Sequence, residues 1–200
     1  QFKINQQLNL TFMTSVSIAV IVPCYKVSEH ILTVIGQIPP VTQAVYVVDD
    51  DCPEQSGELV KQNCKDPRVK VIKLPVNLGV GGAVMEGYKH ALRDGHDILV
   101  KLDGDGQMDP ELIPILCAPI VSGQADYTKG NRFYDLKEIL EMPKVRILGN
   151  ALLSFFSKIS TGYWSIFDPN NGYTAIHANI ASHLPMEKIS QRFFSFQIIH

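Results

Sequence analysis

Segments typical of buried strands alternate with helical segments along most of this chain, and this alternation restricts its fold more than any other feature. Ser15–Pro23 is an almost continuous apolar, β-branched run, typical of a strand buried on both faces in a parallel sheet. A helix is predicted over Glu29–Ile38, because two prolines follow and end it. The later segments are a strand at Val41–Asp50, a helix near Gln55–Cys64, a strand at Val69–Leu74, a helix at Gly82–Leu92, a strand at Asp97–Leu102, a helix from Asp109–Pro110 to about Ser122 and a strand at Ala125–Lys129.

This order predicts an α/β fold with an open, mostly parallel sheet and helices on both faces. With 200 residues, 46% of them hydrophobic, the chain can bury a core without disulfides or a structural metal. Its four cysteines stand singly, which argues against a zinc site or a redox dithiol and favours a reducing, cytoplasmic setting. A net charge of −2, without basic runs, argues against nucleic acid as a partner.

The two ends of the sequence lead to expectations about domain limits. Residues 1–12 are interpreted as an upstream extension, because Met13 stands just before the first strand segment. Residues 13–200 are predicted to form one domain. Arg192–His200 stops without a helix cap or a polar tail, which we interpret as a truncation. No stretch reaches the roughly 18 apolar residues that a membrane-spanning helix needs.

Acidic residues follow the second and fourth predicted strands. They form the clusters Asp49–Asp51 and Asp103-Gly-Asp105-Gly-Gln107, which we expect at adjacent strand ends. Ligands of open α/β sheets bind at the carboxyl ends of the strands. The glycines beside Asp105 leave the backbone free to bend, so that Asp103 and Asp105 reach one hard cation. A single cluster of this kind is equally typical of a turn or a helix cap.

A glycine-rich segment, Asn77–Ala83, follows the third predicted strand and opens a helix. It fits a tight turn, or a helix start whose amides favour a diphosphate. A dinucleotide fingerprint belongs on the first strand-to-helix turn and would need glycine at Val84. No Gly-Lys-Ser/Thr follows, so the segment is not a P-loop.

Taken together and in order, these motifs resemble family 2 glycosyltransferases of the GT-A fold, and more narrowly the dolichyl- or polyprenyl-phosphate sugar synthases. The resemblance extends over about Val16–Phe194. It rests on Val22–Tyr25, Val47–Asp50, Asn77–Ala83, Asp103–Gln107, Gly130–Arg132 and Asp168–Tyr173.

The resemblance implies a site for a nucleotide-sugar donor. Asp50 is expected to bind the base or ribose, and Asp103, Asp105 and Gln107 to hold Mg²⁺ or Mn²⁺ on the diphosphate. A divalent ion stabilises the negative charge of the departing nucleoside diphosphate. The donor-binding residues implied in this way are Pro23, Tyr25, Val48, Asp50, Asn77, Gly79, Asp103 and Gly104.

The resemblance also implies an acceptor site in the second half of the chain. Arg132, Arg146 and Asn150, which replaces a serine of the family, are expected to bind the acceptor phosphate. Two guanidinium groups suit a phosphate by geometry, although without the resemblance either arginine would be an ordinary surface residue. An apolar stripe on the helix predicted over Arg146–Ser160 fits either a core or a membrane interface.

The reaction implied is an inverting transfer of a hexose to a polyprenyl phosphate, with Asp105, Arg132 and Arg146 as catalytic residues and Asp168 near the sugar. A phosphate acceptor is already an anion and needs no protein base. Ser195 and Gln197 stand where relatives often carry acids, and Val27 where they carry glutamate.

The enzyme is expected at the cytoplasmic face of a membrane, peripheral or anchored. The alternatives are transfer to a saccharide or lipid hydroxyl, a non-catalytic nucleotide-sugar-binding relative, and, more remotely, a dinucleotide-dependent oxidoreductase.

Overall fold

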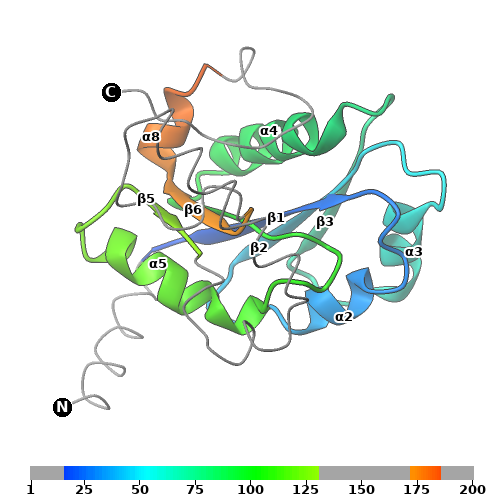
Figure 1. The fold of residues 1–200 in the computed structure, drawn as a ribbon, viewed down its shortest axis with the longest axis horizontal. Helices are drawn as coiled ribbons and strands as arrows, with labels where there is room; N and C mark the ends of the chain where they lie inside the picture. Colours follow the sequence, from blue (N-terminus) through cyan, green and yellow to red (C-terminus); the bar gives the residue numbers. More distant parts are fainter. Residues whose placement is uncertain (1–15, 131–171, 186–200) are drawn as a thin grey trace, which may run out of the picture.

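The computed structural model describes residues 16–130 and 172–185, whose strands form one six-stranded sheet (Figure 1). The strand order is β3-β2-β1-β4-β6-β5. Neighbouring strands from β3 to β4 run parallel, while β6 is antiparallel to β4 and β5. The bounds are β1 Ile18–Cys24, β2 Ala44–Asp49, β3 Val69–Lys73, β4 Ile98–Lys101, β5 Tyr127–Lys129 and β6 Thr174–His177. The predicted open, mostly parallel sheet is confirmed.

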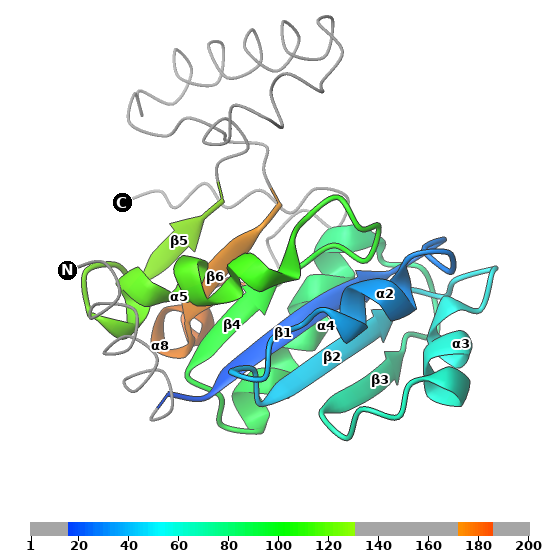
Figure 2. The same cartoon turned by 90° about the horizontal axis from the view of Figure 1, so that it is seen from below.

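Helices cover both faces of this sheet (Figure 2). One face carries α2 (Ile31–Gly36), α3 (Ser56–Asn63) and α5 (Ile113–Val121), the last preceded by the 3₁₀ helix η1 (Pro110–Leu112). The other face carries α4 (Gly79–Arg93) and α8 (Ala178–Ser182). Every predicted helix that falls within the described residues is present.

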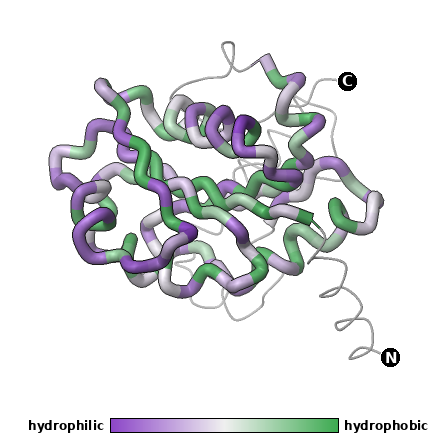
Figure 3. Tube along the Cα trace, turned by 180° about the vertical axis from the view of Figure 1, so that it is seen from behind, coloured by the Kyte–Doolittle hydropathy of each residue, from purple (hydrophilic) through white to green (hydrophobic). Residues whose placement is uncertain are grey.

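Strand β1 is the centre of the core because all of its residues are buried. Val20 and Val22 pack in the cluster beneath α2 and α5, while Ala19 and Ile21 pack in the cluster beneath α4. Successive side chains of a strand point to opposite faces, so a strand covered on both faces needs apolar residues throughout. Hydrophobic segments, green in Figure 3, accordingly run through the middle of the molecule.

The observed element bounds differ from the predicted ones by a few residues. Strand β2 begins at Ala44 rather than Val41, because the segment before it makes a turn in which the Thr42 amide donates to the Pro39 carbonyl. Helix α4 begins at Gly79 rather than at Gly82, so all the glycines of the glycine-rich segment lie in its first turn. Asp109 is a cap as predicted, since its Oδ1 accepts from the Glu111 amide at 2.9 Å.

The expectation that the two acidic clusters lie on adjacent strands is wrong. Strand β1 lies between β2 and β4 and is hydrogen-bonded to both. The chain returns to the far side of its first strand after β3, a crossover that the order of segments along the sequence does not specify. The clusters therefore flank β1 on its two sides.

A polar network joins Tyr46 of β2 to residues that precede β1 and β4, and it lies away from the acidic clusters. The Tyr46 hydroxyl donates to Asp94 Oδ2 at 2.5 Å, and Lys70 also contacts this carboxylate. His96 Nε2 lies 3.1 Å from the Tyr46 oxygen, and its Nδ1 lies 2.7 Å from Ser17 Oγ. Because the single Tyr46 proton goes to Asp94, Nε2 of His96 is the donor to the Tyr46 oxygen. Burial lowers the pKa of His96.

Candidate active site

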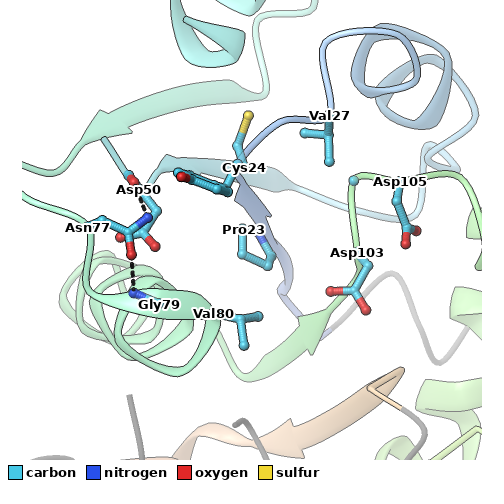
Figure 4. A pocket seen from close by; sticks show the side chains of 11 residues that line it. Pro23, Cys24, Val27, Asp50, Asn77, Gly79, Val80, Asp103 and Asp105 are labelled. Atoms are coloured by element: carbon cyan, nitrogen blue, oxygen red, sulfur yellow. Dashed lines mark hydrogen bonds between the residues drawn. The ribbon is translucent and has the colours of Figure 1, made fainter. Parts of the chain in front are cut away.

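A pocket of about 370 Å³ opens at the carboxyl ends of β1, β2 and β4, beside the start of α4 (Figure 4). This is the edge at which open α/β sheets bind ligands. The residues that line it are Pro23, Cys24, Tyr25, Val27, Asp50, Asn77, Gly79, Val80, Asp103, Gly104 and Asp105. Residues from four separate sequence motifs thus meet in one cavity.

The pocket brings together most of the residues predicted for the donor and the metal. Val48 lies elsewhere: its side chain is fully buried in the core beneath α4. Gln107 is exposed on the loop after β4, and the pocket lining does not include it; its backbone amide donates to Asp105 Oδ1 at 3.0 Å. The remaining predicted donor residues and both aspartates of the metal pair line the pocket.

Asp49 is the last residue of β2 and Asp50 follows it, but their carboxylates make different contacts. Asp49 is buried, and its carboxylate accepts from the Cys52 amide at 2.8 Å and the Gly57 amide at 2.9 Å. It therefore fixes the start of α3 and faces away from the pocket lining. Asp50 is the neighbour that lines the pocket.

Asp50 also anchors the turn that opens α4. Its Oδ1 accepts from the Leu78 amide at 2.6 Å, and its carbonyl accepts from Asn77 Nδ2 at 3.0 Å. Asn77 Oδ1 in turn accepts from the Gly79 amide (Figure 4). Burial raises the pKa of Asp50, and the amides of Leu78 and Gly79 oppose that shift. The result is a carboxylate held rigidly at one wall of the pocket.

Asp103 and Asp105 lie on the other side of Pro23 in Figure 4. Asp103 Oδ1 is 2.6 Å from the ammonium of Lys101, the last residue of β4. Within residues 16–130 and 172–185, no group of three or more His, Cys, Asp or Glu side chains could hold a metal ion. Two carboxylates in one pocket still fit Mg²⁺ or Mn²⁺, because such ions commonly take their other ligands from phosphate oxygens and water.

Four residues around the site were not among the predicted donor or metal residues. Cys24, Val27 and Val80 line the pocket beside predicted neighbours. The fourth, Lys101, is only 3% exposed and contacts Asp103. Its signal in the sequence is a lysine within an apolar strand segment.

The predicted acceptor residues Arg132, Arg146 and Asn150 lie outside the described residues, as do Asp168 and the segment containing Ser195 and Gln197. Their roles stay predictions. Of the helices that the structure describes, none has both the length and the apolar character needed to span a membrane.

Comparison with known proteins gives one family match and several relatives. The model of the family described as "Glycosyl transferase family 2" matches residues 19–184. An undecaprenyl-phosphate mannosyltransferase of Micrococcus luteus is 28% identical over 181 residues, which cover 89% of this chain and 73% of that one. A UDP-N-acetylglucosamine–dolichyl-phosphate N-acetylglucosaminyltransferase of Methanococcus voltae is 28% identical over 190 residues, covering 88% and 75%.

Among solved structures, glucosyl-3-phosphoglycerate synthase of Mycobacterium tuberculosis, in complex with Mn²⁺ and UDP-glucose, matches with a TM-score of 0.68. The two chains are 17% identical, and the match covers 89% of this chain and 62% of that one. This chain therefore spans less than two thirds of its structural neighbour. The similarity confirms the predicted GT-A fold.

Proposed function

Because this chain belongs to glycosyl transferase family 2, we propose that it moves a hexose from a nucleotide-diphosphate sugar to a polyprenyl phosphate, with inversion and with the help of a divalent metal. The observation that carries the donor half of this proposal is the pocket itself. It places Asp50 on one side of β1 and the pair Asp103 and Asp105 on the other.

Each side of this pocket has a distinct role in the proposal. Asp50 accepts a hydrogen bond from the base or ribose, near Pro23 and Tyr25. Asp103 and Asp105 hold Mg²⁺ or Mn²⁺, which would stabilise the charge of the leaving diphosphate as a Lewis acid. The glycine-rich start of α4 presents backbone amides beside the same cavity. The solved neighbour, a complex with Mn²⁺ and UDP-glucose, supports a divalent metal and a nucleotide-sugar donor.

The names of the relatives support the acceptor half, since one uses undecaprenyl phosphate and the other dolichyl phosphate. In this chain, Arg132, Arg146 and Asn150 are proposed to bind the acceptor phosphate. The phosphate oxygen attacks the anomeric carbon in line with departure of the diphosphate, and no side chain has to remove a proton. Such an acceptor places the reaction at a membrane surface, which we propose to be its cytoplasmic face.

The first test measures donor binding by calorimetry, with UDP-glucose and GDP-mannose, each with and without Mn²⁺. Wild type is expected to bind one donor in a metal-dependent manner, and Asp105→Asn to lose at least tenfold in affinity, about 1.4 kcal/mol. The matched control is Asp126→Asn, which neutralises an exposed aspartate beside β5. Failure of the wild type to bind either donor would contradict the donor assignment.

The second test separates the acceptor classes by turnover with the bound donor. Transfer to polyprenyl phosphate, reduced by Arg132→Ala or Arg146→Ala, is the expected result. Transfer to a saccharide or lipid hydroxyl instead would make the chain a polysaccharide-type member of the family. Donor binding without turnover on any acceptor would identify it as a non-catalytic nucleotide-sugar-binding relative.

A further inference from the structure

Lys101 is a buried lysine placed directly behind the proposed metal site. Only 3% of the residue is exposed, and its ammonium lies 2.6 Å from Asp103 Oδ1. Among the residues that the structure describes, its ion-pair partner is Asp103. Burying an ammonium is costly even when it is paired, and such a pair often adds no net stability; the partner here, Asp103, keeps 28% of its side chain exposed. The position of Lys101 therefore needs another explanation.

The surroundings hold this ammonium in place. Lys101 ends β4 between Ile21 of β1 and Thr174 of β6. Gly172 passes so close that a methyl group built on it would collide with Lys101 Nζ and lie 3.1 Å from Asp103 Oδ2. The backbone at Gly172 thus closes over the ion pair. With Oδ1 bound to Lys101, Asp103 has one oxygen left for a cation.

Charge in this part of the site favours a metal only together with a diphosphate. The carboxylates of Asp103 and Asp105 and the ammonium of Lys101 sum to a single negative charge. A divalent cation alone would reverse it, leaving a positive charge beside a buried ammonium that repels the ion at close range. The diphosphate of a nucleotide sugar supplies the negative charges that offset both cations.

We propose that Lys101 is a positioning residue that makes metal binding at Asp103 and Asp105 depend on the diphosphate of the donor. It does so by holding one oxygen of Asp103 and by opposing a cation that arrives without its nucleotide. This inference rests on the proposed donor site. It adds a residue that no motif of the sequence assigned to that site.

The experiment compares Mn²⁺ binding to the 200-residue chain with and without UDP or GDP, counting free Mn²⁺ by its electron paramagnetic resonance signal. Lys101→Met removes the charge and keeps the apolar stem. It is expected to bind Mn²⁺ alone about tenfold more tightly than wild type, and the nucleotide is expected to strengthen Mn²⁺ binding about tenfold less. A residue that only supported the fold would weaken Mn²⁺ binding when replaced, so the sign is diagnostic.

Two further variants make the result specific. Lys101→Gln keeps a hydrogen-bond donor for Asp103 without the charge, so it is expected to tighten Mn²⁺ binding in the same direction as Lys101→Met but by less; it also serves if the methionine variant does not fold. Lys89→Met removes an exposed lysine paired with Glu86 on α4 and is expected to leave Mn²⁺ binding unchanged.

The role of Lys101 alone would be overturned if folded Lys101 variants bound Mn²⁺ as weakly as wild type or more weakly. This outcome requires that wild type binds Mn²⁺ and that Asp105→Asn loses this binding. Absence of nucleotide-dependent Mn²⁺ binding in wild type would overturn the donor site and this inference together.

Discussion

Replacing Asp49 and Asp50 one at a time separates a structural carboxylate from a binding one. Asp49→Asn keeps one oxygen acceptor but presents an amide group to one of the two backbone N–H groups, those of Cys52 and Gly57, that now donate at 2.8 and 2.9 Å. A hydrogen bond to a charged group contributes about 1.5–3 kcal/mol, and the charge at the start of α3 adds about 0.5 kcal/mol. The expected loss of unfolding free energy is therefore about 2–3.5 kcal/mol.

Asp50→Asn is expected to behave in the opposite way. An asparagine oxygen can still accept from the Leu78 amide. The change also removes a charge that burial and the neighbouring Asp49 and Asp51 disfavour, which is why the pKa of Asp50 is raised. A raised pKa means that the folded state binds more protons, so the stability due to Asp50 is lost as pH rises through the folded pKa. At neutral pH the variant should match wild type within about 0.5 kcal/mol or exceed it, yet lose donor affinity.

Urea unfolding followed by circular dichroism measures both free energies, and calorimetry measures donor affinity. Equal slopes against urea would confirm that the midpoints report stability. If the two variants unfold at the same urea concentration, or if Asp49→Asn loses donor affinity while remaining as stable as wild type, the assignment of roles is refuted.

Two further predictions concern the core and the polar network. Gly87→Ala places a methyl group 2.5 Å from Ile21 Cγ2 and is expected to cost about 1–3 kcal/mol, whereas Gly36→Ala, with no atom within 4 Å, should be neutral or stabilising; thermal unfolding compares them. His96 has a pKa below its ordinary 6.5, so the unfolded chain binds more protons and stability should fall as pH drops from above 6.5 through the folded pKa. Melting temperatures between about pH 8 and about pH 5 should show this slope in wild type and not in His96→Gln.

The elements were predictable because the evidence for them is local. The apolar run of β1 reports burial on both faces, and the prolines after Ile38 end a helix whatever the rest of the chain does. Bounds were less predictable, because hydrogen bonds such as that from Thr42 to Pro39 decide where a strand begins. The sequence pattern of β4 does not indicate that it pairs with the side of β1 opposite β2, because this pairing depends on tertiary structure.

The pocket was predictable from motifs, but the direction of individual side chains was not. Val48 belongs to the same motif as Asp50 and shares its face of the sheet, but it lies within β2 in the core beneath α4, whereas Asp50 follows the end of the strand and lines the pocket. Asp49 and Asp50 look alike in the sequence, but Asp49 accepts hydrogen bonds from the Cys52 and Gly57 amides, whereas Asp50 accepts from the Leu78 amide and lines the pocket. Lys101 stands out in the sequence as a lysine within an apolar strand segment, but its ion pair with Asp103 is known only from the structure.

The strand order that the sequence did not predict is what gives the proposed site its dimensions. Adjacent strands lie about 4.8 Å apart, so acidic clusters on adjacent strands would be close enough to share one cation. With β1 between them, the ends of β2 and β4 stand about 10 Å apart, and Pro23 and Cys24 of β1 line the pocket between them. That spacing separates a contact to the base or ribose at Asp50 from a contact to the diphosphate at Asp103 and Asp105. The separation of the two proposed contacts therefore follows from the position of β1 between β2 and β4.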